Sequence, residues 1–71
     1  MREISFIEYL HVTGYFIRNK IATNKNYPNN EVEWIDKNGN ILAKRTKVSN
    51  NKFINLVDES VFTKIIKDTC F

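Results

Sequence analysis

The chain has 71 residues, of which 42% are hydrophobic and 13% aromatic, and its formal net charge is +3. This length has room for one domain over residues 1–71, and the apolar content excludes a disordered chain. The positive charge excludes an acidic mimic of DNA and weakly favours a polyanionic partner. Cys70 is the only cysteine in the sequence, so neither an internal disulfide nor a cysteine-rich zinc site can form. The sequence shows no apolar run long enough for a signal peptide or a membrane span, and we expect a cytoplasmic protein.

Residues 5–23 carry the first helical pattern. Ser5-Phe6-Ile7-Glu8 predicts a capping box, in which the serine hydroxyl and the glutamate carboxylate satisfy backbone amides at the start of a helix. The helical spacing that follows is interrupted by His11-Val12-Thr13-Gly14, where two β-branched residues precede a glycine. Two interpretations are open: one helix with a weak point, or two short helices joined by a turn, with Thr13 capping the second. We favour two helices.

The remainder of the chain is predicted to be mostly extended. Residues 25–30 have the composition of a loop, and residues 31–46 predict a β-hairpin around Asn38-Gly39, because this dipeptide suits the positive φ angles of a tight turn. Residues 52–57 predict a third strand, and Asp58 predicts the cap of a final helix. The large residues expected in the core are Phe6, Phe16, Trp34, Phe53 and Phe62.

The apolar spacing between residues 7 and 21 matches the requirements of a helix-turn-helix. Such a motif needs apolar residues inside its first helix, one in the turn, and two on the buried face of the second helix. The residues at these places, in order, are Ile7, Leu10, Val12, Ile17 and Ile21. The side chains between the last two would then project outward and could enter a major groove.

These residues carry a resemblance to a known family. Residues 7–13, followed by Ile17 and Ile21, resemble the helix-turn-helix of excisionases and AlpA-type phage regulators, which belong with the MerR-like winged helices. Residues 25–28 correspond to the position at which the recognition helix ends in that family. Residues 62–66 are similar to the C-terminal tail of conjugative-transposon excisionases. The resemblance implies an α+β winged helix-turn-helix with two N-terminal helices, a three-stranded antiparallel sheet or hairpin wing, and a C-terminal helix.

The resemblance also implies a set of DNA contacts. Arg18 would make a bidentate contact with guanine and Asn19 with adenine, while Thr13 would hold a phosphate at the start of the second helix. The basic residues of the wing would position the protein on the DNA backbone without selecting a sequence. The predicted DNA-binding residues are Thr13, Tyr15, Arg18, Asn19 and Lys20 on the second helix, and Lys37, Asn38, Asn40, Lys44, Arg45 and Lys47 in the wing.

The leading hypothesis is therefore a sequence-specific DNA-binding protein of a mobile element or phage, acting in excision or in transcriptional control. Its expected partners are double-stranded DNA, an integrase or recombinase, and further copies of itself on adjacent sites. The alternative is a small α+β protein-binding module, such as a phage-encoded inhibitor, which would expose an apolar patch on Tyr9, Tyr15 and Phe16 and would lack a continuous basic face.

The sequence offers no convincing catalytic or metal-binding set. Asp36, Asp58 and Glu59 are accompanied by no nucleophile–base pair, and the first two occupy turn or cap positions. His11 has no second histidine or cysteine ligand near it in the sequence. We expect neither an enzyme nor a cofactor.

Overall fold

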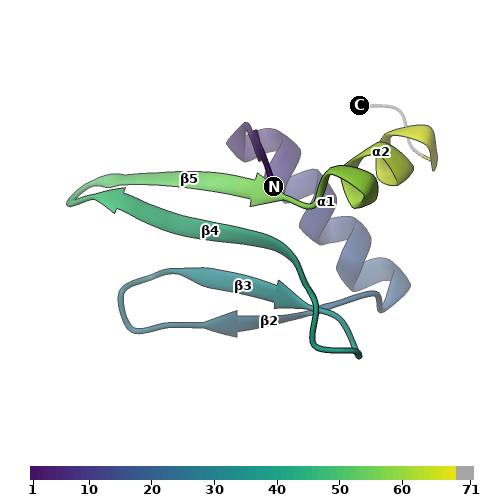
Figure 1. Ribbon diagram of the computed structural model, residues 1–71, viewed down its shortest axis with the longest axis horizontal. Coiled ribbons are helices and arrows are strands. Elements are labelled where there is room, and N and C mark those ends of the chain that lie inside the picture. Colours follow the sequence, from purple (N-terminus) through teal and green to yellow (C-terminus); the bar gives the residue numbers. More distant parts are fainter. Residues whose placement is uncertain (69–71) are drawn as a thin grey trace.

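The chain forms a five-stranded antiparallel sheet with two helices (Figure 1), and the computed structural model describes residues 1–68. Cys70 lies outside the described residues. Along the sheet the strands follow the order β1-β5-β4-β3-β2. The elements in chain order are β1 (Arg2–Ile4), α1 (Phe6–Asn19), β2 (Thr23–Asn26), β3 (Val32–Ile35), β4 (Ile41–Ser49), β5 (Lys52–Val57) and α2 (Glu59–Asp68).

The predicted winged helix-turn-helix is wrong, because residues 6–19 form one unbroken helix. Val12 does not fill a corner between two helices; it is fully buried on the face of α1 that covers the sheet, together with Tyr9 and Phe16. Thr13 caps nothing, since it lies inside the helix and its hydroxyl donates to the carbonyl oxygen of Leu10 at 3.3 Å. Burial of one face against the sheet thus outweighs the weak helix propensity of residues 11–14.

The sheet is larger than the predicted hairpin and third strand. β1 pairs with β5, so that Arg2 lies opposite Val57, and β2 pairs with β3 at the other edge. β2 occupies residues that were predicted to end a helix and begin a loop. The chain is therefore α+β, but with a single long helix between β1 and β2 and with five strands in place of a wing.

Several local predictions are confirmed. Ser5 and Glu8 form the capping box, with Glu8 N–H donating to Ser5 Oγ at 3.1 Å and Ser5 N–H donating to Glu8 Oε1 at 2.9 Å. Gly39 takes a positive φ of 85° in the turn between β3 and β4. Asp58 caps α2, where its Oδ1 accepts hydrogen bonds from the Ser60 hydroxyl at 2.6 Å and from the backbone amides of Val61 and Ser60. These bonds, first of all that from the Ser60 hydroxyl, lower the pKa of Asp58.

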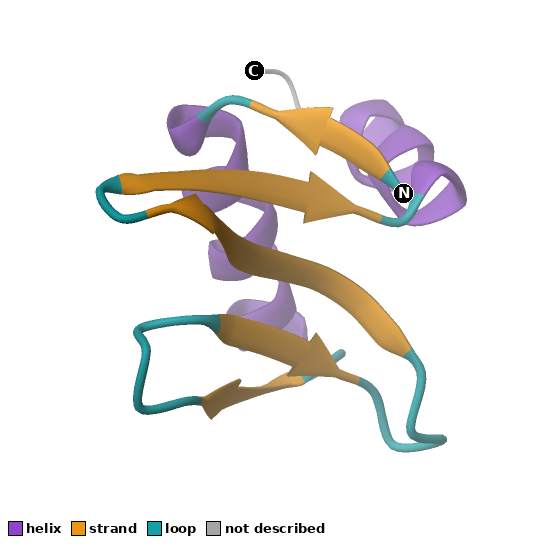
Figure 2. Cartoon of the chain, turned by 60° about the vertical axis from the view of Figure 1, so that its left-hand side comes forward, coloured by secondary structure: helices purple, strands orange, loops and turns teal. Residues whose placement is uncertain are grey.

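The core lies between the sheet and both helices, which pack against the same face (Figure 2). Trp34 and Phe16 pack with ring centroids 5.9 Å apart, and Trp34 Nε1 donates to the Tyr9 hydroxyl at 3.0 Å. Burial raises the pKa of Tyr9, which keeps this hydroxyl protonated. The expectation that Phe6 fills the core is wrong, since more than half of its side chain is exposed. Among the described residues, no helix is long and apolar enough to cross a membrane.

Candidate functional site

The residues of α1 that were predicted to contact DNA do not form a separate recognition helix. Thr13 is buried, and Tyr15 is half-buried against the core. Asn19 Nδ2 donates to the carbonyl oxygen of Tyr15 at 3.0 Å, and Lys20 ends the helix in a left-handed conformation with φ 53°. Arg18 is exposed. Thr13 and Tyr15 are therefore covered within the fold, whereas Arg18, Asn19 and Lys20 are exposed at the end of the single helix α1.

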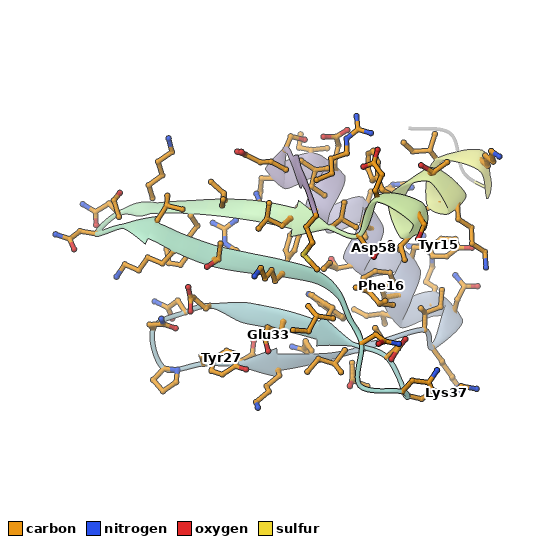
Figure 3. The ribbon with its side chains drawn as sticks, viewed as in Figure 1. Tyr15, Phe16, Tyr27, Glu33, Lys37 and Asp58 are labelled. Atoms are coloured by element: carbon orange, nitrogen blue, oxygen red, sulfur yellow. The ribbon has the colours of Figure 1, made fainter. Side chains whose placement is uncertain are left out.

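The polar residues of the predicted wing tip are largely occupied within the turn. The carboxylate of Asp36 accepts hydrogen bonds from the backbone amides of Asn38 and Asn40, each at 2.9 Å, and from Asn40 Nδ2 at 3.2 Å. These donors, first of all the Asn40 amide, lower the pKa of Asp36 and keep it ionised. Lys37 is exposed at the same turn, at the lower right of Figure 3.

The basic residues of β4 point to different faces of the sheet. Arg45 lies on the helical face, where its guanidinium carbon is 5.0 Å from the ring centroids of both Phe6 and Phe53. Lys44 lies on the opposite face, because side chains alternate along a strand, and it pairs in register with Glu33. Lys47 is exposed beyond the end of β3. These three residues therefore do not all face the same side of the sheet.

The apolar patch expected for the alternative, a protein-binding module, is also not where the sequence predicted it. Tyr9 and Phe16 are buried, so the apolar patch predicted on Tyr9, Tyr15 and Phe16 does not exist. The exposed apolar side chains of α1 lie instead at Ile7, Leu10 and Ile17. The chain thus presents apolar surface, but on the helix face that sequence patterning assigned to the interior.

A groove at the carboxyl end of α1 gathers residues from several elements. Because α1 ends at Asn19 and the chain then turns to the edge strand β2, the helix leaves one end of the sheet uncovered. The groove there has a volume of about 820 Å³. Its apolar lining comes from the end of α1 and from the strands around the β3–β4 turn, and consists of Ile17, Ile21, Ala22, Trp34, Ile35 and Leu42.

A β-bulge helps to shape this groove. Trp34 pairs with Ala43 and Ile35 with Ile41, so that Leu42 is an extra residue of β4 without a counterpart in β3. Such a bulge bends the strand and redirects its side chains. The carbonyl oxygen of Leu42 accepts a hydrogen bond from the Asp58 amide at 2.8 Å, which fixes the bulge to the start of α2.

Two of the predicted DNA-binding lysines meet at this groove. Lys20 follows α1 and Lys37 belongs to the β3–β4 turn, yet both line the groove, and both are exposed. The structure therefore brings together an apolar lining and two exposed lysines from separate parts of the chain. Sequence reasoning missed Ile21, Leu42 and Trp34 as members of one surface, and the only sequence signal for it was the basic character of Lys20 and Lys37.

A second hollow, of about 330 Å³, is polar and lies around the β2–β3 turn and β4. The Tyr27 hydroxyl donates to Glu33 Oε1 at 2.6 Å (both labelled in Figure 3). Glu31 Oε2 accepts from the Thr46 hydroxyl at 2.7 Å and from the Lys47 amide at 2.9 Å. These polar groups bond to one another and thereby hold the strands together.

Residues 1–68 contain no cluster of histidine, cysteine, aspartate and glutamate side chains that could hold a metal ion. No family model, curated protein or solved structure matches this chain.

Proposed function

We propose that this chain is a protein-binding module whose groove at the end of α1 receives an apolar, acidic segment of a partner protein. The observation that carries the proposal is a groove lined both by apolar residues, among them Ile17, Trp34 and Leu42, and by the lysines Lys20 and Lys37. Concave apolar surfaces with a few polar groups at their edges are the usual form of binding sites.

The position of the groove favours a polypeptide segment as its ligand. Ile17 lines the groove and is also exposed along α1, so the apolar surface continues from the hollow onto the helix. A peptide can place one apolar side chain in the hollow and extend along this surface, as in other cases where a groove accepts a helix or an extended chain.

The charges at the groove favour an acidic segment. Lys20 and Lys37 attract carboxylates, and the whole chain carries a formal net charge of +3. The one carboxylate nearby, Asp36, accepts hydrogen bonds from its own turn. Complementary charge at the edge of an interface accelerates association and excludes basic competitors.

DNA binding, in excision or transcriptional control, was predicted from a helix-turn-helix that the chain does not have. It remains a prediction with a simple test. Affinity for duplex DNA should fall steeply with salt, with a log–log slope of about −0.9 for each phosphate neutralised.

The experiment selects binders from a random peptide library displayed against the purified chain. We expect enrichment of peptides that combine apolar residues with aspartate or glutamate, and a change in the fluorescence of Trp34, the only tryptophan, when they bind. The variant Lys20→Glu/Lys37→Glu should lose at least about ten-fold in affinity for them. The matched control Lys47→Glu/Lys52→Glu changes two exposed lysines away from the groove and should bind as the wild type does.

Either of two results would overturn the proposal. One is a selection in which the groove variant and the control variant recover the same peptides. The other is salt-dependent binding of duplex DNA that requires Lys20 and Lys37, because these lysines would then serve phosphate contacts.

A further inference from the structure

Helix α1 has two apolar faces, and only one of them is covered. Tyr9, Val12 and Phe16 are buried against the sheet. On another face, the exposed fractions are 76% for Ile7, 53% for Leu10 and 64% for Ile17. A helix that is apolar on more than one side is typical of a helix that is buried on more than one side, and large exposed apolar surfaces mark interaction sites.

The uncovered residues have the spacing of a helix–helix interface. Ile7, Leu10, Gly14 and Ile17, here called the outer stripe, follow one another at intervals of three, four and three residues. This alternation is the a/d pattern by which two helices pack with side chains of one between those of the other. The outer stripe therefore fits the face of another helix better than it fits an irregular partner.

We propose that the outer stripe binds the outer stripe of a second copy of this chain, with the two α1 helices antiparallel. The stripe is symmetric about the level of Val12: Ile7 and Ile17 are each five residues from it, and Leu10 and Gly14 are each two residues from it. In an antiparallel pair, Ile7 therefore meets Ile17 of the second copy. Leu10 meets Gly14 of the second copy, so the largest central side chain faces the position with no side chain. A two-fold interface needs this kind of self-complementarity.

Leu10 and Gly14 select the antiparallel direction. In a parallel pair, Gly14 would lie opposite Gly14 of the second copy and leave a gap, and Leu10 would lie opposite Leu10. In an antiparallel pair, Leu10 of each copy fills the space beside Gly14 of the other. A Cβ at Gly14 would lie 3.2 Å from Arg18 Nη1, so the guanidinium rests beside the glycine in the single chain. Arg18 is exposed, and its long side chain can move aside when Leu10 of the second copy approaches Gly14.

The first experiment measures the mass of the chain in solution over a range of concentrations, by sedimentation equilibrium. We expect a reversible monomer–dimer equilibrium whose dissociation constant rises at least about ten-fold in Leu10→Glu, since the charge would be buried against Gly14 of the second copy. The matched control is Val48→Glu, because Val48 is 50% exposed but belongs to the end of β4. It should dimerise as the wild type does. A chain that stays monomeric at all concentrations, or equal weakening by both variants, would overturn the proposal.

The second experiment tests the direction, in a Cys70→Ser background that removes the natural thiol. Ile7→Cys and Ile17→Cys chains carry tags of different mass and are mixed under mild oxidation. In the antiparallel pair, residue 7 of one copy and residue 7 of the other are separated along the helix axis by the length of ten residues, which is about 15 Å. We expect disulfides between Ile7→Cys and Ile17→Cys chains. Abundant disulfides between two Ile7→Cys chains would show a parallel pair and overturn the antiparallel arrangement.

The dimer interface and the groove share Ile17, whereas Leu10 belongs to the outer stripe and does not line the groove. Leu10→Glu should therefore abolish the dimer without lowering affinity for the selected acidic peptides by more than about two-fold. Loss of both properties together in this variant would show that the outer stripe and the groove form one surface for a single partner, which would contradict the proposed dimer.

Discussion

Arg45 joins the start of α1 to β5 on the helical face of the sheet. Its guanidinium lies over the rings of Phe6 and Phe53, and its Nη1 donates to Asn55 Oδ1 at 2.7 Å. Asn55 is buried, so this bond satisfies a polar group that water cannot reach freely. Arg45 was predicted to contact DNA. Its structural environment could not be predicted because it depends on the register between β4 and β5, which places Asn55 opposite Arg45, and on Phe6 at the start of α1.

Replacing Arg45 with alanine should destabilise the fold. Arg45→Ala removes two ring contacts and leaves Asn55 without this donor, which should cost about 2–3 kcal/mol of unfolding free energy. Urea denaturation measures the change. The matched control is Lys44→Ala, on the opposite face of the same strand, which should change stability by no more than about 0.5 kcal/mol. Equal and small effects of both substitutions would contradict the structural role of Arg45.

Glu31 makes the stability of the folded chain depend on pH in the acid range. Hydrogen bonds from the Lys47 amide, the Thr46 hydroxyl and the Asn29 side chain lower its pKa from 4.5 to about 2. A carboxylate with a lowered folded pKa contributes stability that is fully present above pH 4.5 and is lost as the pH falls toward 2.

We therefore expect the melting temperature to fall between pH 4.5 and pH 2, and to fall less steeply in Glu31→Gln. Thermal unfolding followed by circular dichroism across this range provides the measurement. The control is Glu3→Gln, an exposed carboxylate on the edge strand β1, which should keep the steepness of the wild type. A Glu31→Gln profile as steep as that of the wild type would show that these hydrogen bonds do not stabilise the folded chain.

At the scale of elements, α1 explains why the helix-turn-helix prediction failed. The motif was assigned from Ile7, Leu10, Val12, Ile17 and Ile21. Of these, only Val12 is fully buried, and the face that packs on the sheet is completed by Tyr9, Thr13 and Phe16. Both sets of residues have helical spacing, and spacing alone cannot decide which set meets the sheet.

A substitution at Gly14 tests whether residues 6–19 form one helix or two short helices. It lies inside α1, and an added Cβ would meet only the mobile end of Arg18. Gly14→Ala should therefore stabilise the chain by about 0.5–1 kcal/mol, because alanine has the higher helix propensity. The measurement belongs in a Leu10→Glu background, so that self-association does not contribute.

The matched control for Gly14 is Gly39→Ala. Gly39 has a φ of 85°, which an alanine adopts with strain, so this substitution should destabilise the chain by about 1 kcal/mol or more. If Gly14→Ala destabilised the chain to a similar extent, a turn at residues 13–14 would be the better description.

At the scale of the whole molecule, α2 closes the core. Phe62 and Ile65 are almost completely buried, and the guanidinium carbon of Arg2 lies 4.7 Å from the centroid of the Phe62 ring. A chain of 71 residues has a total unfolding free energy of about 4–11 kcal/mol. A single large core side chain therefore contributes a large share of the stability.

Phe62→Ala should cost about 3–5 kcal/mol and leave the chain partly unfolded at room temperature. Ile66→Ala removes a side chain that is 42% exposed, and it should cost about 1 kcal/mol or less. Chemical denaturation of both variants measures the difference. A cooperative transition for Phe62→Ala close to that of the wild type would show that α2 is not part of the common core.

The local signals in the sequence were sufficient to predict the capping box of Ser5 and Glu8, the turn at Gly39 and the cap at Asp58. Each depends on hydrogen bonds or φ angles within about four residues, so the chain encodes it locally. Three other features depend on tertiary contacts: the choice of the face of α1 that is buried, the pairing of residues 2–4 with β5, and the position of Lys20 and Lys37 at one groove. Burial and strand pairing join residues far apart in the sequence, and their free energy depends on partners that no local pattern identifies.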